Sequence, residues 1–142
     1  MTDIPALRPP HESHTIDTVH GLTRHWRALM GPLGFSHHRL WLLLLNPDGW
    51  VIPHVVQIDD IPPGAEAADC VPLLEMAGHI VPEAGSLAIL LSRAGSNPIT
   101  TDDRSWARGL TEAGVRQGIR MWPVHFANDV ELRVFAPDDL IG

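Results

Sequence analysis

The feature that most constrains the fold is an apolar run that ends in a strong turn signal. Residues 40–45 read Leu-Trp-Leu-Leu-Leu-Leu, which is the length of a β-strand and leaves no polar face. Such a run is typical of a strand covered on both sides, so it predicts a sheet with other elements packed on each face. In the Asn-Pro-Asp-Gly sequence of residues 46–49, Pro sets the first turn dihedral and Gly accepts a positive φ. A hairpin into a second strand over residues 50–58 is therefore expected.

Hydrophobic spacing predicts the remaining elements. Apolar residues three and four apart indicate an amphipathic helix over residues 16–30 and two further helices. Short apolar runs indicate three more strands. After the hairpin we expect a helix with Pro72 in its first turn that ends before Gly85, a strand over residues 86–91, a helix capped by Thr100 or Thr101 and stopped by Gly118, and strands over residues 121–127 and 130–135.

This order of elements, α-β-β-α-β-α-β-β, predicts an α/β chain of the α+β type with a central mixed sheet flanked by helices. A length of 142 residues fits one domain, which we expect over residues 15–142. Residues 1–14 contain three Pro and few apolar residues, a composition that favours a flexible, extended arm.

Composition excludes several classes of partner and site. The net charge of −7 argues against binding to nucleic acid or to an anionic membrane. All ten basic residues are Arg, which is typical of a GC-rich bacterium. Cys70 is the only cysteine, so disulfides within the chain and multi-cysteine metal sites are excluded, and a small buried apolar role is expected for it. Because the first residues lack the basic and apolar regions of a secretory signal, a soluble, cytoplasmic protein is expected.

A family resemblance emerges downstream of the strand over residues 86–91. Thr100-x-x-Asp103 and the residues Leu110, Ala113, Gly114, Gly118 and Ile119 resemble the capped helix and its stop in the RadC-like branch of the JAB/MPN family. The matching residues lie within about residues 98–120, and the order of the predicted elements matches that of the family over about residues 40–135. The resemblance implies a JAB/MPN-like layering of sheet and helices; a layering similar to that of cytidine deaminases fits the same order.

The sequence departs from the family at the residues that carry its chemistry. The His-x-His pair that binds zinc in the family falls on Leu90-Leu91-Ser92, and the catalytic Glu has no counterpart between Arg39 and Ile58. The family's hydrolysis needs a zinc-bound water, and one remaining Asp does not hold zinc in that manner. We therefore expect a metal-free relative without a cofactor, acting as a non-catalytic binding or assembly module that associates with itself or with another protein.

An alternative is a hydrolase that acts on small molecules or peptides. His54 and His125 each lie within an apolar strand, and neighbouring strands would let them share a pocket with Ser92 and Asp103. The competing interpretation is that these histidines are hydrogen-bonded residues of the core. No serine has the Gly-x-Ser-x-Gly surroundings of a hydrolase nucleophile.

Two tryptophans and a proline suggest an interface. Trp26 and Trp50 lie near the ends of predicted elements, where side chains can remain partly exposed, and exposed aromatic residues are enriched at interfaces. Pro53 cannot donate to a β-ladder, so its strand is expected at a sheet edge. Together they predict a possible surface for self-association.

Overall fold

The computed structural model describes residues 15–31, 33–34, 38–62 and 64–140, apart from the side chain of His54. The arm predicted for residues 1–14 lies outside the described residues. The helices and strands follow in the predicted order, and a short 3-10 helix is added near the C-terminus. They are α1 (Val19–Met30), β1 (Arg39–Leu45), β2 (Val51–Asp59), α2 (Ala67–Ile80), β3 (Ser86–Ser92), α3 (Thr101–Arg116), β4 (His125–Ala127), β5 (Leu132–Val134) and η2 (Pro137–Leu140).

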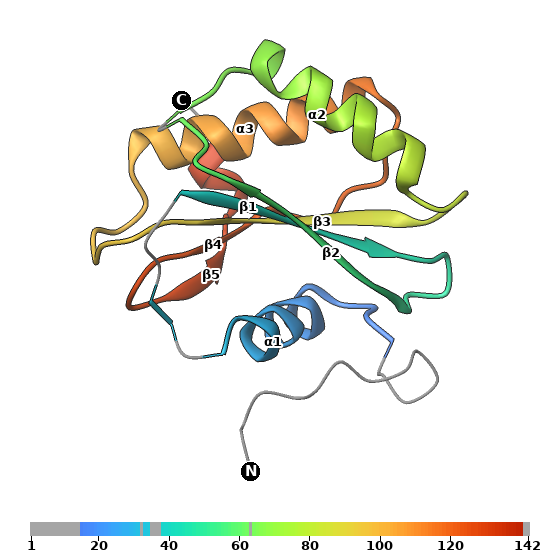
Figure 1. Ribbon diagram of the computed structural model, residues 1–142, viewed down its shortest axis with the longest axis horizontal. Coiled ribbons are helices and arrows are strands. Elements are labelled where there is room, and N and C mark those ends of the chain that lie inside the picture. Colours follow the sequence, from blue (N-terminus) through green and yellow to red (C-terminus); the bar gives the residue numbers. More distant parts are fainter. Residues whose placement is uncertain (1–14, 32, 35–37, 63, 141–142) are drawn as a thin grey trace.

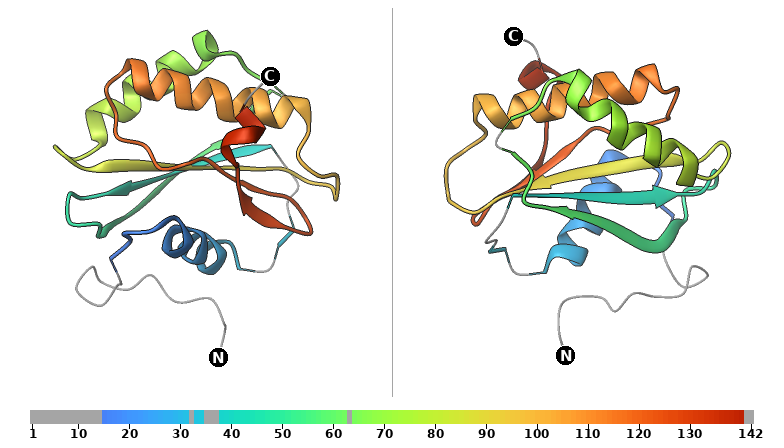
Figure 2. Two further views of the ribbon diagram at one scale, coloured as in Figure 1. Left: turned by 180° about the vertical axis from the view of Figure 1, so that it is seen from behind. Right: turned by 45° about the horizontal axis from the view of Figure 1, so that its top comes forward.

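The strands form one mixed sheet in the order β2-β1-β3-β4-β5. β1 is antiparallel to both β2 and β3, β3 is parallel to β4, and β4 is antiparallel to β5. α2 and α3 cover one face of the sheet and α1 covers the other (Figure 1). Views from behind and from above show the same three layers (Figure 2). The predicted single-domain α+β class with a central mixed sheet is therefore confirmed.

The apolar run of β1 is buried on both faces of the sheet. Leu40 and Leu42 belong to the core beneath α2 and α3, whereas Leu43 and Leu45 pack under α1. Each of the four side chains is at most 1% exposed. Because full burial of one Leu side chain stabilises a fold by about 1.5–3 kcal/mol, this strand is a large contributor to both cores.

Local hydrogen bonds decide where α2 and α3 begin. α3 starts at the expected cap, where Thr100 Oγ1 accepts from the Asp103 N–H at 3.2 Å and Asp103 Oδ2 accepts from the Thr100 N–H at 2.9 Å. α2 starts earlier than predicted, because Glu66 and Asp69 form a second capping box. Pro72 consequently lies inside α2, and the prediction that it occupies the first turn is wrong.

The first C-terminal strand is shorter than its apolar pattern predicts. Only residues 125–127 pair regularly with β3, and Met121 makes one isolated bridge to Leu87. Pro123 lies between these two pairings and has no N–H to donate. The ladder therefore breaks between Met121 and His125.

Candidate functional site

The four candidate pocket residues do not converge on one cleft. Ser92 and His125 lie on adjacent strands on the α1 side of the sheet, whereas Asp103 belongs to α3 on the opposite side. His54 belongs to β2, which β1 and β3 separate from β4. Three strand spacings amount to about 14 Å. The condition for a shared pocket, that the strands of the two histidines are neighbours, is therefore not met.

Asp103 has a partner that the sequence analysis missed. Its carboxylate is 1% exposed and is bound by the Arg93 guanidinium, with Nε at 3.1 and 3.2 Å from the two oxygens and Nη2 at 2.9 Å from Oδ2. Oδ2 also accepts from the Thr100 N–H at the start of α3. The available signal was an Arg directly after a buried strand, followed ten residues later by an Asp in a helix cap.

Arg93 also closes the loop between β3 and α3. Its Nη2 donates to the carbonyl oxygens of Asn97 at 2.9 Å and Pro98 at 3.0 Å. Its Cζ lies 4.9 Å from the centroid of the Phe126 ring, within the range of a cation–π interaction. The guanidinium therefore neutralises Asp103, holds the loop and covers an aromatic ring of the core at the same time.

These contacts differ from the zinc site of the family that the sequence resembles. Both oxygens of Asp103 are already engaged by Arg93, and Leu90 and Leu91 are fully buried. Ser92 Oγ, the remaining candidate, accepts from the Trp41 indole N–H at 2.9 Å on the opposite side of the sheet. Across the described ranges, no group of three His, Cys, Asp or Glu is placed to hold a metal ion.

His38 lies beside this ion pair. It directly precedes β1, and its carbonyl oxygen accepts from the Ile61 N–H at 3.3 Å. Burial lowers the pKa of His38, while the charge of Asp103 raises it and that of Arg93 lowers it. Its Nε2 is buried and has no hydrogen-bond partner among the described residues.

His125 is a fully buried residue of the sheet. Its Nε2 lies 2.7 Å from Thr23 Oγ1, and its Nδ1 lies 3.3 Å from the Pro123 carbonyl oxygen. Burial lowers the pKa of His125 to about 4, although the contact with Pro123 acts in the opposite direction. The ring is therefore neutral near pH 7, and α1 and the chain before β4 hold it on both sides.

The residues predicted for an interface differ in exposure. Trp26 is fully buried, because it faces the sheet from α1 together with Leu22, and the prediction that it stays partly exposed is wrong. Trp50 is half-buried at the end of the hairpin turn. Pro53 is exposed on β2, which is an edge strand as expected.

Cys70 is 1% exposed in α2, and burial raises the pKa of its thiol to about 11. No described helix combines the length and the apolar character that crossing a bilayer requires. Comparison of the chain with protein-family models, with curated proteins and with solved structures finds no match.

Proposed function

We propose that this chain is a non-catalytic binding and assembly module on a scaffold similar to the JAB/MPN fold. The observation that carries the proposal is the buried Arg93–Asp103 ion pair. In the family, the matching Asp helps to hold zinc, whereas here its charge is neutralised by an Arg at the end of the preceding strand. The succession of buried strand, loop and capped helix around this pair supports the resemblance.

Metal analysis tests the non-catalytic part of this proposal. We expect the protein to retain no zinc after dialysis against zinc and then against metal-free buffer. The Arg93→Met variant is a control that should also retain no zinc, because it frees the Asp103 carboxylate without supplying the missing imidazoles. Stoichiometric zinc that disappears on replacing His54 or His125 by Ala, or Asp103 by Asn, would overturn the proposal.

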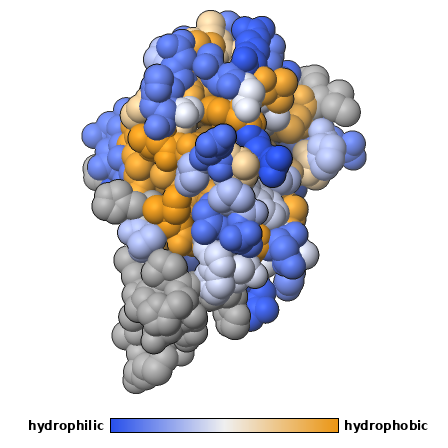
Figure 3. All heavy atoms as spheres, turned by 90° about the vertical axis from the view of Figure 1, so that its right-hand side faces the viewer, coloured by the Kyte–Doolittle hydropathy of each residue, from blue (hydrophilic) through white to orange (hydrophobic). Residues whose placement is uncertain are grey.

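The outer face of α2 provides a surface for assembly. Besides the buried Cys70, only Asp69, Glu75 and His79 are ionisable among its 14 residues, and Met76 and Ile80 are each 42% exposed. Helices that are apolar on nearly all sides are usually covered by other protein surface on more than one side. Figure 3 shows apolar residues gathered over the C-terminal half of α2 and the strands beneath it.

The occupant that we propose for this face is a second copy of the chain. Two copies that each carry a charge of −7 repel one another, so they approach most readily through a face with little charge. The ionisable residues nearest to Met76 along α2 are Glu75 and His79, an acid and a base. A two-fold contact presents the same patch from both copies, so an antiparallel crossing of the two α2 helices at Met76 brings the Glu of each near the His of the other.

Sedimentation velocity at increasing protein concentration tests the proposed dimer. We expect reversible dimerisation of the wild-type chain and of the Val115→Glu variant, which places a charge on α3 at a side chain that is 72% exposed. We expect Met76→Glu to remain monomeric with an unchanged circular dichroism spectrum. A wild-type chain that stays monomeric at every concentration, or Met76→Glu that dimerises like Val115→Glu, would exclude a dimer through α2.

A further inference from the structure

A second feature, far from the Arg93–Asp103 pair, is a pocket at the opposite end of β3. The pocket has a volume of about 270 Å³ and lies between the residues before α1, the β1–β2 turn and the chain that follows α3. Since β3 runs from Ser86 in the pocket wall to Ser92 beside Arg93, the two places are roughly 20 Å apart. Its lining includes Asp17, Asp48, Arg120, Met121 and Trp122.

Backbone contacts fix the wall formed by the hairpin turn. The Ile16 N–H donates to the Gly49 carbonyl oxygen at 2.8 Å, which ties the start of the α1 segment to the turn. Gly49 has a φ of +89°, and a Cβ at this position would lie 2.6 Å from the Ile16 carbonyl oxygen. Asn46 Oδ1 accepts from the N–H groups of Asp48 and Trp50 at 2.9 and 3.0 Å. This wall is therefore formed before any ligand arrives.

The opposite wall is equally well held. The Leu87 N–H donates to the Arg120 carbonyl oxygen at 2.9 Å, and the Trp122 N–H donates to the Leu87 carbonyl oxygen at 3.0 Å. The Trp122 indole N–H donates to Ser86 Oγ at 2.9 Å. These bonds anchor the backbone of Arg120, whose side chain is exposed, and Trp122 lines the pocket on the α1 side of the sheet.

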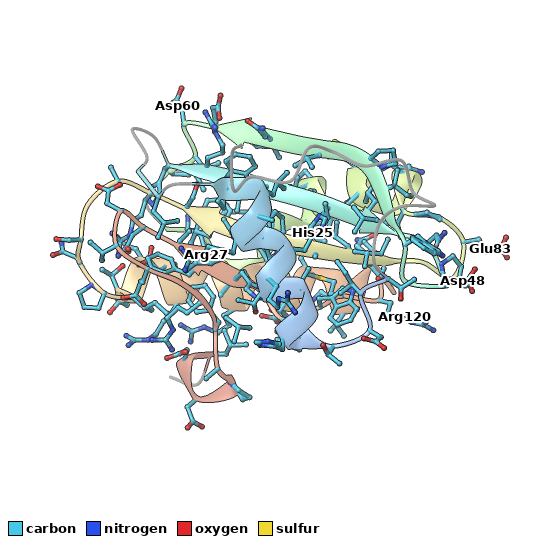
Figure 4. The ribbon with its side chains drawn as sticks, turned by 90° about the horizontal axis from the view of Figure 1, so that it is seen from below. His25, Arg27, Asp48, Asp60, Glu83 and Arg120 are labelled. Atoms are coloured by element: carbon cyan, nitrogen blue, oxygen red, sulfur yellow. The ribbon has the colours of Figure 1, made fainter. Side chains whose placement is uncertain are left out.

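Charges of both signs line the pocket. Asp17, Asp48 and Arg120 are exposed, and none of them forms an ion pair with another described residue. Figure 4 shows Asp48 and Arg120 at the same end of the sheet, with Glu83 nearby. Among the described residues that line the pocket, Arg120 is the one cation, and Asp17 and Asp48 are the two carboxylates.

We infer that this pocket binds a small zwitterion, an α-amino acid with an apolar side chain. The guanidinium of Arg120 presents donors in the geometry that a carboxylate accepts. The carboxylates of Asp17 and Asp48 supply the acceptors that an ammonium group needs. Trp122 offers apolar surface to the ligand side chain, and an open pocket of about 270 Å³ admits a molecule of this size. A ligand that carries only a negative charge would be repelled by the two Asp residues, and a ligand that carries only a positive charge would be repelled by Arg120.

Titrations followed by heteronuclear NMR test this inference with L-phenylalanine and L-leucine as probes. We expect saturable shifts of the amide signals of Gly49, Met121 and Trp122. N-acetyl-L-phenylalanine lacks the ammonium group and L-phenylalaninamide lacks the carboxylate, so each should bind at least about tenfold more weakly. Equal binding of these derivatives, or no saturable shift with either amino acid, would overturn the inference.

Variants locate the binding and separate it from the proposed dimer. We expect Arg120→Gln and Asp48→Asn each to weaken the binding of L-phenylalanine about tenfold, because each removes one charged partner. Arg108→Gln, which removes an exposed Arg from α3, is the matched control and should bind like the wild type. Unchanged binding by Arg120→Gln would refute the site. Because Met76→Glu leaves the pocket intact, it should bind the amino acid whether or not the chain dimerises.

Discussion

Acidification should destabilise this fold through His125. The imidazole is completely buried, and its pKa is lowered by that burial from 6.5 to about 4. A neutral imidazole carries one N–H, so it donates either to Thr23 or to Pro123 but not to both. Protonation would supply the second donor, yet it would also place a charge in the apolar core, and the desolvation of that charge dominates.

The size of the effect follows from the difference in proton affinity between the two states. In the unfolded chain His125 takes up a proton as the pH falls through about 6.5, whereas in the folded chain it does so only near pH 4. Over this window the unfolded state binds more protons, so the free energy of unfolding decreases as the pH falls. The total loss is about 3 kcal/mol, and the loss is complete below about pH 4.

Urea unfolding measured across this pH range checks the prediction. His125→Gln is the informative variant, because its amide can still donate to Thr23 but does not titrate. Other groups, among them His25 and His38, whose pKa values burial also lowers, contribute equally to the wild type and the variant. The difference in unfolding free energy between the two proteins should therefore change by about 3 kcal/mol between pH 7 and pH 4.

A control variant removes a histidine that is exposed. His20→Gln on α1 should follow the wild-type pH dependence. If the curves for the wild type and His125→Gln run parallel through the whole range, burial of His125 does not govern the acid response and the reasoning is refuted.

Three further predictions concern the Arg93–Asp103 ion pair, two glycines and the buried cysteine. Arg93→Met should lower the unfolding free energy by about 3–5 kcal/mol, because it leaves the Asp103 charge buried without a partner. Adding Asp103→Asn should recover most of the lost free energy. A double variant that is no more stable in urea than Arg93→Met would contradict this. Gly85→Ala should lower the unfolding free energy by about 1–3 kcal/mol, because the new Cβ would lie 2.4 Å from a backbone oxygen of β1. Gly78→Ala should raise the unfolding free energy by about 0.5–1 kcal/mol, because Gly78 lies on the exposed side of α2 and the nearest contact of its new Cβ is at 3.7 Å. Melting temperatures that shift in the same direction for both variants would be inconsistent with these contacts. Cys70 should react with a thiol reagent only when the chain unfolds, because its side chain is 1% exposed and its pKa is raised to about 11. Fast labelling of the folded chain would show that the thiol is accessible.

The order of elements was predictable because it depends on local patterns. The spacing of apolar residues in α1, the turn after β1 and the cap at Thr100 each act within a few residues. The start of α2 was missed for an equally local reason, since the capping box of Glu66 and Asp69 lies outside the apolar periodicity that was used to place the helix.

The candidate site was not predictable in the same way. Whether two strands are neighbours depends on pairings between distant segments, and β1 and β3 separate the strands of His54 and His125. The position of Asp103 across the sheet from His125 follows from which face α3 covers, which the sequence of α3 does not specify by itself. Arg93 was overlooked because a charged residue in a polar loop is usually solvated, and only the fold reveals the carboxylate beneath it.

The hydrogen bond between Thr23 and His125 joins residues that are 102 positions apart in the chain. During synthesis α1 leaves the ribosome before β4, the strand that carries its polar anchor, and β1, β2, α2, β3 and α3 are made in between. The apolar side of α1, with Leu22 and Trp26, therefore depends on β1 and β3 for cover in the interval. The bond to β4 therefore secures α1 only after five further elements have been made, so a nascent chain halted before β4 lacks the bond that fixes α1 to its sheet.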